Sequence, residues 1–230
     1  MLHLDHLSLT QDGFTVSANW HLPAGSRLAL LGPSGAGKST LLMGLAGFVA
    51  ASAGRILWQG RDLAALTPAQ RPVSILFQDQ NLFPHLSVSQ NLGLAINPRL
   101  RLNASDLARV ESVLDRLGLK GLGERKPANL SGGQLGRAAL GRVLLQARPL
   151  LLLDEPFAAL GPALKADLLG LVADLAAEAG TTVILVTHDP ADARRFAGGV
   201  ALVHDGVADA PVATDAIFAN PPPALRDYLG

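Results

Sequence analysis

The feature that most constrains this chain is a glycine-rich segment that matches the pattern G-x-x-x-x-G-K-[ST]. The segment reads Gly32-Pro33-Ser34-Gly35-Ala36-Gly37-Lys38-Ser39. An apolar stretch at 27–31 precedes it and favours a buried strand, and the spacing at 40–47 favours a helix. A strand, a glycine loop and a helix in this order are the context in which the pattern binds phosphate.

The residue types in this segment explain its chemistry. Glycines let the backbone curl so that successive N–H groups point at an anion, and the helix that follows adds the partial positive charge of its N-terminus. Lys38 can neutralise the β- and γ-phosphates of a nucleotide, and the Ser39 hydroxyl can ligate Mg²⁺. We therefore expect nucleotide binding at Gly32, Pro33, Ser34, Gly35, Ala36, Gly37, Lys38, Ser39 and Thr40.

Composition narrows the function classes. The 19 basic and 19 acidic residues cancel, so charge gives no support for nucleic acid as a partner. The absence of cysteine excludes disulfides, thiolate metal sites and cysteine catalysis. Because no uninterrupted apolar run reaches about 18 residues, we expect any membrane role to act through another subunit.

Apolar strands alternate with helices along most of the 230 residues, which indicates a mainly parallel sheet covered on both faces. We predict an α/β fold with a P-loop NTPase core and an N-terminal antiparallel β subdomain at 2–9 and 14–22. A helical subdomain at about 87–147 is expected to be inserted in this core, within a single domain spanning 1–230. The other expected strands are 27–31, 54–60, 73–77, 150–153 and 182–186, the helices are 87–96, 105–117, 131–147 and 162–179, and a hairpin near 201–207 precedes a helical tail from 213.

Two carboxylates end the apolar run at 150–153. In a parallel sheet, ligands gather at the carboxyl ends of the strands, where the glycine loop also lies. Asp154 is therefore placed to hold Mg²⁺, directly or through water. Glu155, the next residue, can orient or deprotonate an attacking water.

A third motif, Leu130-Ser131-Gly132-Gly133-Gln134, lies about twenty residues before the carboxylates. Ser131 is a good helix N-cap, and the two glycines let an anion approach the exposed N–H groups. Together with the glycine loop and Asp154-Glu155, this motif resembles the signature LSGGQ of the ATP-binding cassette family, and the resemblance covers essentially the whole chain. Gln78 resembles the family's Q-loop residue, and His188 its switch histidine.

The resemblance implies a head-to-tail homodimer in the ATP-bound state. Each ATP would be held by the glycine loop of one copy and by Ser131, Gly132, Gly133 and Gln134 of the other. Glu155 would be the general base, and His188 would contact the γ-phosphate. Gln78 would help to hold the metal and the water, and would link them to the part that docks on transmembrane permease subunits. The implied location is the cytoplasmic face of the bacterial inner membrane.

A narrower resemblance concerns the transported solute. The segments 71–86 and 91–98, together with Ala46-Gly47-Phe48, are similar to those of the family's thiamine-importing ATPases. This implies thiamine import and, indirectly, a periplasmic thiamine-binding protein as a partner. An ATPase subunit does not touch the vitamin, so these segments reflect lineage and permease docking.

The chain departs from the family pattern in three places. Gly136 follows the signature where the family has glutamine, and should weaken that helix by about 1 kcal/mol relative to alanine. Gly161 replaces an aspartate that communicates across the dimer, which predicts reduced coupling or turnover. Gln11 stands where the family's adenine-stacking tyrosine is expected. Phe14 is the nearest ring; it could stack on adenine or belong to the core, and of the two we favour the core.

These departures keep two alternatives open. One is an importer ATPase for another small solute, and the other is an ATP-binding regulatory module with little hydrolysis. Gly161 argues mildly for the second alternative. Five intact residues argue against it, namely Lys38, Gln78, Asp154, Glu155 and His188. Neutral charge and the lack of a long heptad insertion disfavour a DNA-associated ATPase.

Overall fold

A computed structural model describes residues 1–77, 82–158 and 160–229 of the chain, so the predicted Gln78 lies outside the described residues. The strands are β1 (Leu2–Gln11), β2 (Phe14–Leu22), β3 (Arg27–Leu31), β4 (Ala51–Trp58), β5 (Arg61–Asp62), β6 (Val73–Leu76), β7 (Leu150–Asp154), β8 (Thr182–Thr187), β9 (Gly199–His204), β10 (Val207–Ala208) and β11 (Val212–Ala213). The α-helices are α1 (Lys38–Ala46), α2 (Val88–Gly93), α3 (Ala104–Arg116), α4 (Gly132–Leu145), α5 (Pro162–Ala179), α6 (Pro190–Phe196), α7 (Thr214–Ala219) and α8 (Pro223–Leu229).

The strands form one curled sheet with parallel and antiparallel parts. Its order is β5-β4-β1-β2-β10-β9-β3-β8-β7-β6, and β11 pairs with β9. The strands β9, β3, β8, β7 and β6 run parallel to one another. By contrast, β1 pairs antiparallel with both β2 and β4, and β9 pairs antiparallel with β10 and β11. The predicted α/β fold with an N-terminal antiparallel part is therefore confirmed.

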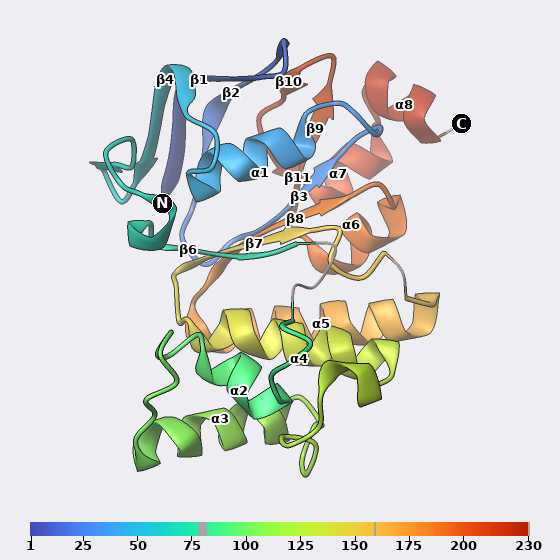
Figure 1. Ribbon diagram of the computed structural model, residues 1–230. Helices are drawn as coiled ribbons and strands as arrows, with labels where there is room; N and C mark the ends of the chain where they lie inside the picture. The colour runs from blue at the N-terminus through green and yellow to red at the C-terminus, as the bar shows by residue number, and fades with distance from the viewer. Residues whose placement is uncertain (78–81, 159, 230) are drawn as a thin grey trace.

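The period of two along the parallel strands divides the apolar side chains between two cores. In β3, Leu28 and Leu30 belong to one core, and Ala29 and Leu31 belong to the other. The first core lies between the sheet, the antiparallel strands and α1. The second lies between the sheet and the remaining helices (Figure 1). Because both faces are covered, these strands read as continuous apolar runs in the sequence.

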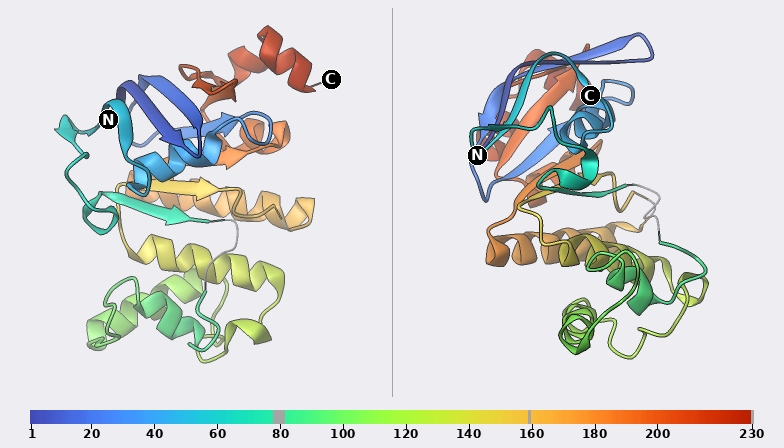
Figure 2. Two further views of the ribbon diagram at one scale, coloured as in Figure 1. Left: turned by 45° about the horizontal axis from the view of Figure 1, so that its top comes forward. Right: turned by 60° about the vertical axis from the view of Figure 1, so that its left-hand side comes forward.

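The helical part of the chain lies beyond the second core. α4 and α5 run beneath the parallel sheet, and α2 and α3 pack farther out, away from β1, β2 and β4 (Figure 1, Figure 2). Ser87 and Asn103 accept hydrogen bonds from backbone N–H groups at the starts of α2 and α3. These caps explain why both helices begin where the sequence predicts a start.

Few details differ from the expected elements. α6 was not predicted, because its seven residues are too short to show a clear helical period. The strand expected at 54–60 begins three residues earlier, at Ala51, and Gly54 bends it with a positive φ of 72°. Among the helices in the described ranges, none combines the length and the hydrophobicity that a membrane-spanning segment needs.

Candidate functional site

The predicted site residues are brought together by the parallel sheet. β3, β7 and β8 are neighbours in register, with Leu31 opposite Thr187 and Asp154 opposite Val186. Their carboxyl ends therefore lie at one edge, followed respectively by the glycine loop, Glu155 and His188. This edge is where α/β sheets bind ligands.

The glycine loop at 32–39 has the tight backbone that the motif requires. A side chain on Gly32 would place its Cβ 2.0 Å from the carbonyl oxygen of Val203, so only glycine fits there. Gly35 and Gly37 have φ values of 80° and 101°, a left-handed conformation that glycine adopts without steric cost. The loop therefore leads directly from β3 into α1, as predicted.

Lys38 lies at the end of this loop, as the first residue of α1. Its side chain is 5% exposed, and its Nζ donates to the carbonyl oxygens of Gly32 and Pro33, both at 2.7 Å. Burial lowers the pKa of Lys38, and the carboxylates of Glu155 and Asp154 oppose that shift. A phosphate in the loop would supply a negative counter-charge that stabilises this buried ammonium group.

Ser39 and Asp154 have the chemistry of a magnesium site. The Ser39 hydroxyl donates to a carboxylate oxygen of Asp154 at 3.0 Å, although the two residues are 115 positions apart. Burial raises the pKa of Asp154 above its ordinary value, against the effect of the Ser39 hydrogen bond. A hydroxyl and a partly buried carboxylate are hard oxygen ligands, and the donor set fits Mg²⁺.

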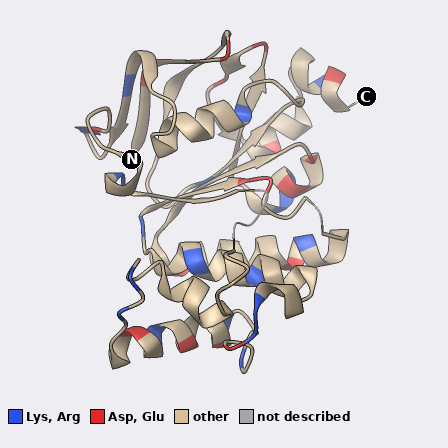
Figure 3. Ribbon diagram, in the orientation of Figure 1, with Lys and Arg blue, Asp and Glu red and all other residues tan. Residues whose placement is uncertain are grey.

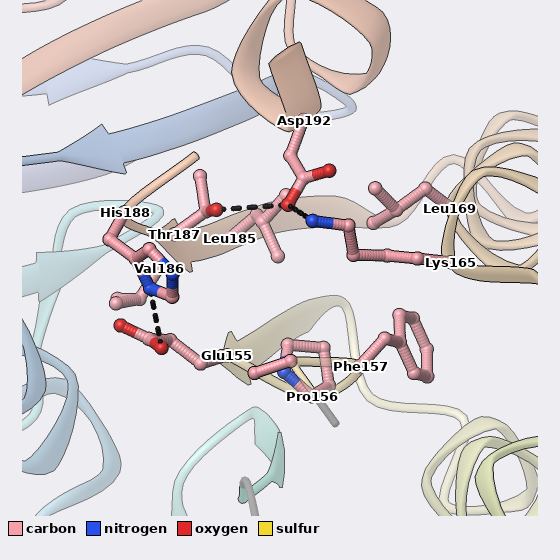
Figure 4. Close-up of a pocket in the computed structure, with 11 residues that line it drawn as sticks. Glu155, Pro156, Phe157, Lys165, Leu169, Leu185, Val186, Thr187, His188 and Asp192 are labelled. Atoms are coloured by element: carbon pink, nitrogen blue, oxygen red, sulfur yellow. Dashed lines mark hydrogen bonds and ion pairs between the residues drawn. The ribbon is translucent and has the colours of Figure 1, made fainter. Parts of the chain in front are cut away.

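Glu155 and His188 face each other across the ends of β7 and β8. The His188 Nδ1 lies 2.8 Å from a carboxylate oxygen of Glu155 (Figure 4). Glu155 has a φ of 43°, in a left-handed conformation that is costly for a residue with a side chain. Such strain persists where the surrounding structure holds it, and it occurs frequently at active sites.

A pocket of about 570 Å³ opens in front of the glycine loop. This volume is in the range of small-molecule and cofactor sites. From the predicted set it is lined by Ser34, Gly35, Gly37, Lys38, Ser39, Thr40 and Glu155. Gly32 and Ala36 are buried behind this lining, where they shape the backbone of the loop.

Phe14 corrects the sequence interpretation. It was expected in the core, but its side chain is 39% exposed and lines this pocket together with Gln11 and Asp12. A Cβ on Gly37 would lie 3.0 Å from the Phe14 ring, which places the ring against the glycine loop. The β1–β2 turn places it there, because Phe14 is the first residue of β2 rather than an inward-facing residue of its middle.

Ser131 and Gln134 form a reciprocal capping box at the start of α4. The Gln134 N–H donates to the Ser131 hydroxyl at 3.3 Å, and the Gln134 side-chain oxygen accepts from the Ser131 N–H at 2.9 Å. The predicted residues 131–134 thus begin a helix of the layer beneath the sheet (Figure 1). They do not line the pocket in front of the glycine loop as far as the structure describes it.

The two departing glycines lie in different settings. Gly136 is buried within α4, which runs without interruption from Gly132 to Leu145. Gly161 is the N-cap of α5 and has no side-chain oxygen to cap the helix, and a Cβ built on it would contact no described residue. The cost of Gly136 and the effect of Gly161 on turnover remain predictions.

An ion-paired cluster next to His188 was not predicted from the sequence. Lys165 of α5 donates to Asp189 at 2.7 Å. Its ammonium group also lies 2.9 Å from Asp192 of α6 (Figure 4). Although burial disfavours its charge, the hydrogen bonds to both carboxylates raise the pKa of Lys165. The Lys165 hydrogen bond also lowers the pKa of Asp189. No motif marks Lys165, so only the fold reveals this cluster.

Charges elsewhere on the chain are mixed. Basic and acidic residues are interspersed along the outer helices, including α3 (Figure 3). The formal net charge of zero is therefore not the sum of two large patches of opposite sign on these helices.

Comparison with known proteins gives a consistent result. The family model described as "ABC transporter" matches residues 16–158. Proteins named thiamine import ATP-binding protein from Cereibacter sphaeroides and from a Ruegeria species are 65% and 55% identical, each over 100% of both chains.

Two solved structures share the fold. One is an ATP-binding cassette dimer in a post-hydrolysis state with ADP and Pi, which is 26% identical with a TM-score of 0.80, and the match covers 93% of this chain and 99% of the other. The second is cbiO1 of Clostridium perfringens, part of an ABC transporter complex. It is 28% identical with a TM-score of 0.81, over 95% of this chain and 90% of the other.

Proposed function

The chain belongs to the ABC transporter family, and we propose that it hydrolyses ATP to drive thiamine import through a separate membrane permease. The observation that most strongly supports ATP hydrolysis is the Glu155–His188 pair, which lies at the same sheet edge as Lys38 and Asp154. The observation that supports thiamine is the name shared by the full-length relatives.

The site residues divide the work of ATP hydrolysis. The N–H groups of the glycine loop and Lys38 bind the β- and γ-phosphates, and Phe14 offers a ring for the adenine to stack on. Glu155 accepts the proton of the attacking water as the general base, and His188 contacts the γ-phosphate and orients Glu155. Ser39 and Asp154, with Gln78, would hold Mg²⁺, which would neutralise charge on the phosphates.

A second copy of the chain completes each site. The N-terminus of α4, with Ser131, Gly132, Gly133 and Gln134, is a binding site for phosphate oxygens, yet the pocket on the same chain does not include it. A head-to-tail homodimer brings this N-terminus to the pocket of the partner. Closing the dimer then excludes water from the bound ATP.

The surface of this chain has a groove on which the permease can dock. A groove of about 620 Å³, lined largely by apolar residues and also by Gln146 and Arg148, lies between the core and the helical part of the chain. Phe48, Val73, Ile75 and Ala95 are among its lining residues, and the Phe48 side chain is 53% exposed. The segment 87–147 acts as a helical subdomain inserted in a single domain 1–230, and this groove follows one side of it.

The cellular setting follows from these partners. The chain is held at the cytoplasmic face of the bacterial inner membrane by its permease, and a periplasmic thiamine-binding protein delivers the vitamin to the other side. Nucleic acid has no part in this function.

Uptake of labelled thiamine tests the proposal. The chain would be reconstituted in liposomes with the co-encoded permease and binding protein, with ATP supplied on the side of the ATPase. We expect ATP-dependent thiamine uptake, and we expect the Lys38→Ala variant to abolish both uptake and ATP binding. Uptake of a different solute, with thiamine ignored, would favour the alternative of another importer; ATP binding without turnover would favour a regulatory module.

A further inference from the structure

Two groups that are not part of the nucleotide pocket hold the carbonyl of His188 and the residue that follows it. One is Lys165, near the start of α5, and the other is Tyr228, in α8 at the far end of the described chain. We propose that Lys165 and Tyr228 are positioning residues that fix His188 for hydrolysis. This inference rests on the role proposed above for His188.

Tyr228 holds the carbonyl group of His188. The phenol hydroxyl donates to the His188 carbonyl oxygen across 40 residues of sequence. Burial raises the pKa of Tyr228, and the negative charges of Glu155 and Asp189 raise it further. The phenol therefore stays protonated and keeps its ability to donate at neutral pH.

The helix that carries Tyr228 is itself anchored. Leu225 of α8 is fully buried in the second core, and the Tyr228 ring packs against that core. The hydroxyl is thus presented by a fixed helix rather than by a free tail. A hydrogen bond between two anchored groups restricts the orientation of the peptide that follows His188.

Lys165 holds the next residue. Its ammonium group bridges the carboxylates of Asp189 and Asp192, and only 18% of the Lys165 side chain is exposed. Asp189 also caps α6 by accepting from the Ala191 N–H at 2.9 Å, and its own N–H donates to the Thr187 hydroxyl at 3.0 Å. The residues before and after His188 are therefore both fixed.

These restraints act on the geometry of the Glu155–His188 pair. The imidazole turns about a backbone that is fixed at its carbonyl and at Asp189, so its Nδ1 is aimed at Glu155. A cavity of about 40 Å³ separates this pair from the Lys165–Asp192 pair (Figure 4). Neither Lys165 nor Tyr228 lines the pocket in front of the glycine loop in the part of the chain that the structure describes, so loss of either should spare nucleotide affinity.

The test compares steady-state ATP hydrolysis by variants of the chain assembled with its permease. Tyr228→Phe removes only the hydroxyl, and we expect it to lower kcat about three- to tenfold with KM for ATP and ADP affinity within twofold. Lys165→Met should lower kcat at least as much, and Lys165→Arg should restore most of it, because arginine can bridge two carboxylates. Leu229→Ala, at an exposed neighbour of Tyr228, is the matched control and should change nothing.

A spectroscopic measurement separates positioning from a general loss of structure. Histidine ring resonances would be recorded by NMR, with His188 assigned from the His188→Ala variant. Tyr228→Phe should shift the His188 resonance, and Leu229→Ala should not. An unchanged kcat, an unshifted His188 resonance, or a change confined to KM in Tyr228→Phe would overturn the inference. Full activity of His188→Ala would instead overturn the proposed role of His188 itself.

Discussion

At the scale of single residues, the site holds charge in places where charge is unfavourable. Asp154 is partly buried, and its pKa is raised chiefly by that burial. Lys38 is more deeply buried, and burial lowers its pKa. Both shifts mean that burial destabilises the ionised forms of these two groups, which Mg²⁺ and phosphate would stabilise when bound, so part of the binding energy offsets this cost.

Asp154→Asn should make the nucleotide-free chain more stable near pH 7. The stability contribution of a group with a raised folded-state pKa is present below its unfolded value of about 3.8 and is lost as pH rises through the folded value. The ionised aspartate therefore costs stability at neutral pH, and asparagine avoids that cost while still accepting from Ser39. Thermal unfolding between pH 7 and pH 4 should show the advantage of the variant shrinking as pH falls.

Magnesium reverses this order. With ATP and Mg²⁺ present, the wild-type chain should gain more in unfolding temperature than Asp154→Asn, because the carboxylate is the stronger ligand. Ser39→Ala serves as the comparison, since it removes the other protein oxygen of the pair. A variant that is less stable than the wild type without magnesium at pH 7 would contradict the assigned cost.

The site residues that could be predicted from the sequence are those that belong to a motif with a defined spacing. Lys38, Ser39, Asp154 and His188 were predicted because spacing and strand ends place them at one edge of the sheet. Phe14 was misinterpreted, because an aromatic residue at the start of a strand reads the same whether it points to the core or to a pocket. Lys165 and Tyr228 were missed, since their partners lie 24 and 40 positions away and no local pattern marks such pairs.

At the scale of elements, the most informative helix start is that of α5. Gly161 occupies the N-cap position with φ −63° and ψ 153°, a conformation that any residue adopts. No described residue has an atom within 4 Å of a Cβ built there. The missing capping oxygen is therefore a local weakness of the helix that carries Lys165.

Gly161→Asp should stabilise the chain by about 0.3–1 kcal/mol, because an aspartate caps the helix and favours its positive end. That gain corresponds to a rise of about 1–4 °C in the unfolding temperature for a chain of this size. We also expect ATP turnover to rise, as the family pattern at this position predicts. Gly161→Ala adds a Cβ but no oxygen, and an equal gain in that variant would contradict the capping explanation.

Element boundaries were predictable wherever a cap or an apolar run defines them. Ser131 begins α4, and the buried run of β7 ends at Asp154, both close to the expected positions. The order of strands in the sheet was not predictable, because pairing between β3 and β8 depends on residues more than 150 positions apart. The second core arises only after such long-range pairing.

At the scale of the whole molecule, the separation between the glycine loop and the N-terminus of α4 predicts dimerisation that depends on ATP. Glu155→Gln should bind ATP without hydrolysing it and accumulate as a dimer. Light scattering coupled to gel filtration, with saturating ATP, measures this directly. Lys38→Ala is the control and should remain monomeric; a monomeric Glu155→Gln chain with bound ATP would contradict the shared site.

The apolar groove predicts a second assembly effect. Phe48→Ser should weaken association with the permease about tenfold, since exposed aromatic residues commonly dominate such interfaces. Affinity for ATP should not change, because Phe48 does not line the nucleotide pocket described here. Leu107→Ser is the matched control: its side chain is 51% exposed on α3, outside the groove. Pull-down of the permease with equal loss in both variants would argue against the groove.

The division of each parallel strand between two cores has a consequence for how the chain melts. Leu28 and Leu30 pack toward α1, and Ala29 and Leu31 pack toward the helices below. Unfolding of the elements on either side would expose one apolar face of the parallel strands, and the elements on the other side pack on these same strands. The nucleotide-binding half and the helical half therefore pack on opposite faces of the same strands. On heating, both halves should unfold together in a single cooperative endotherm.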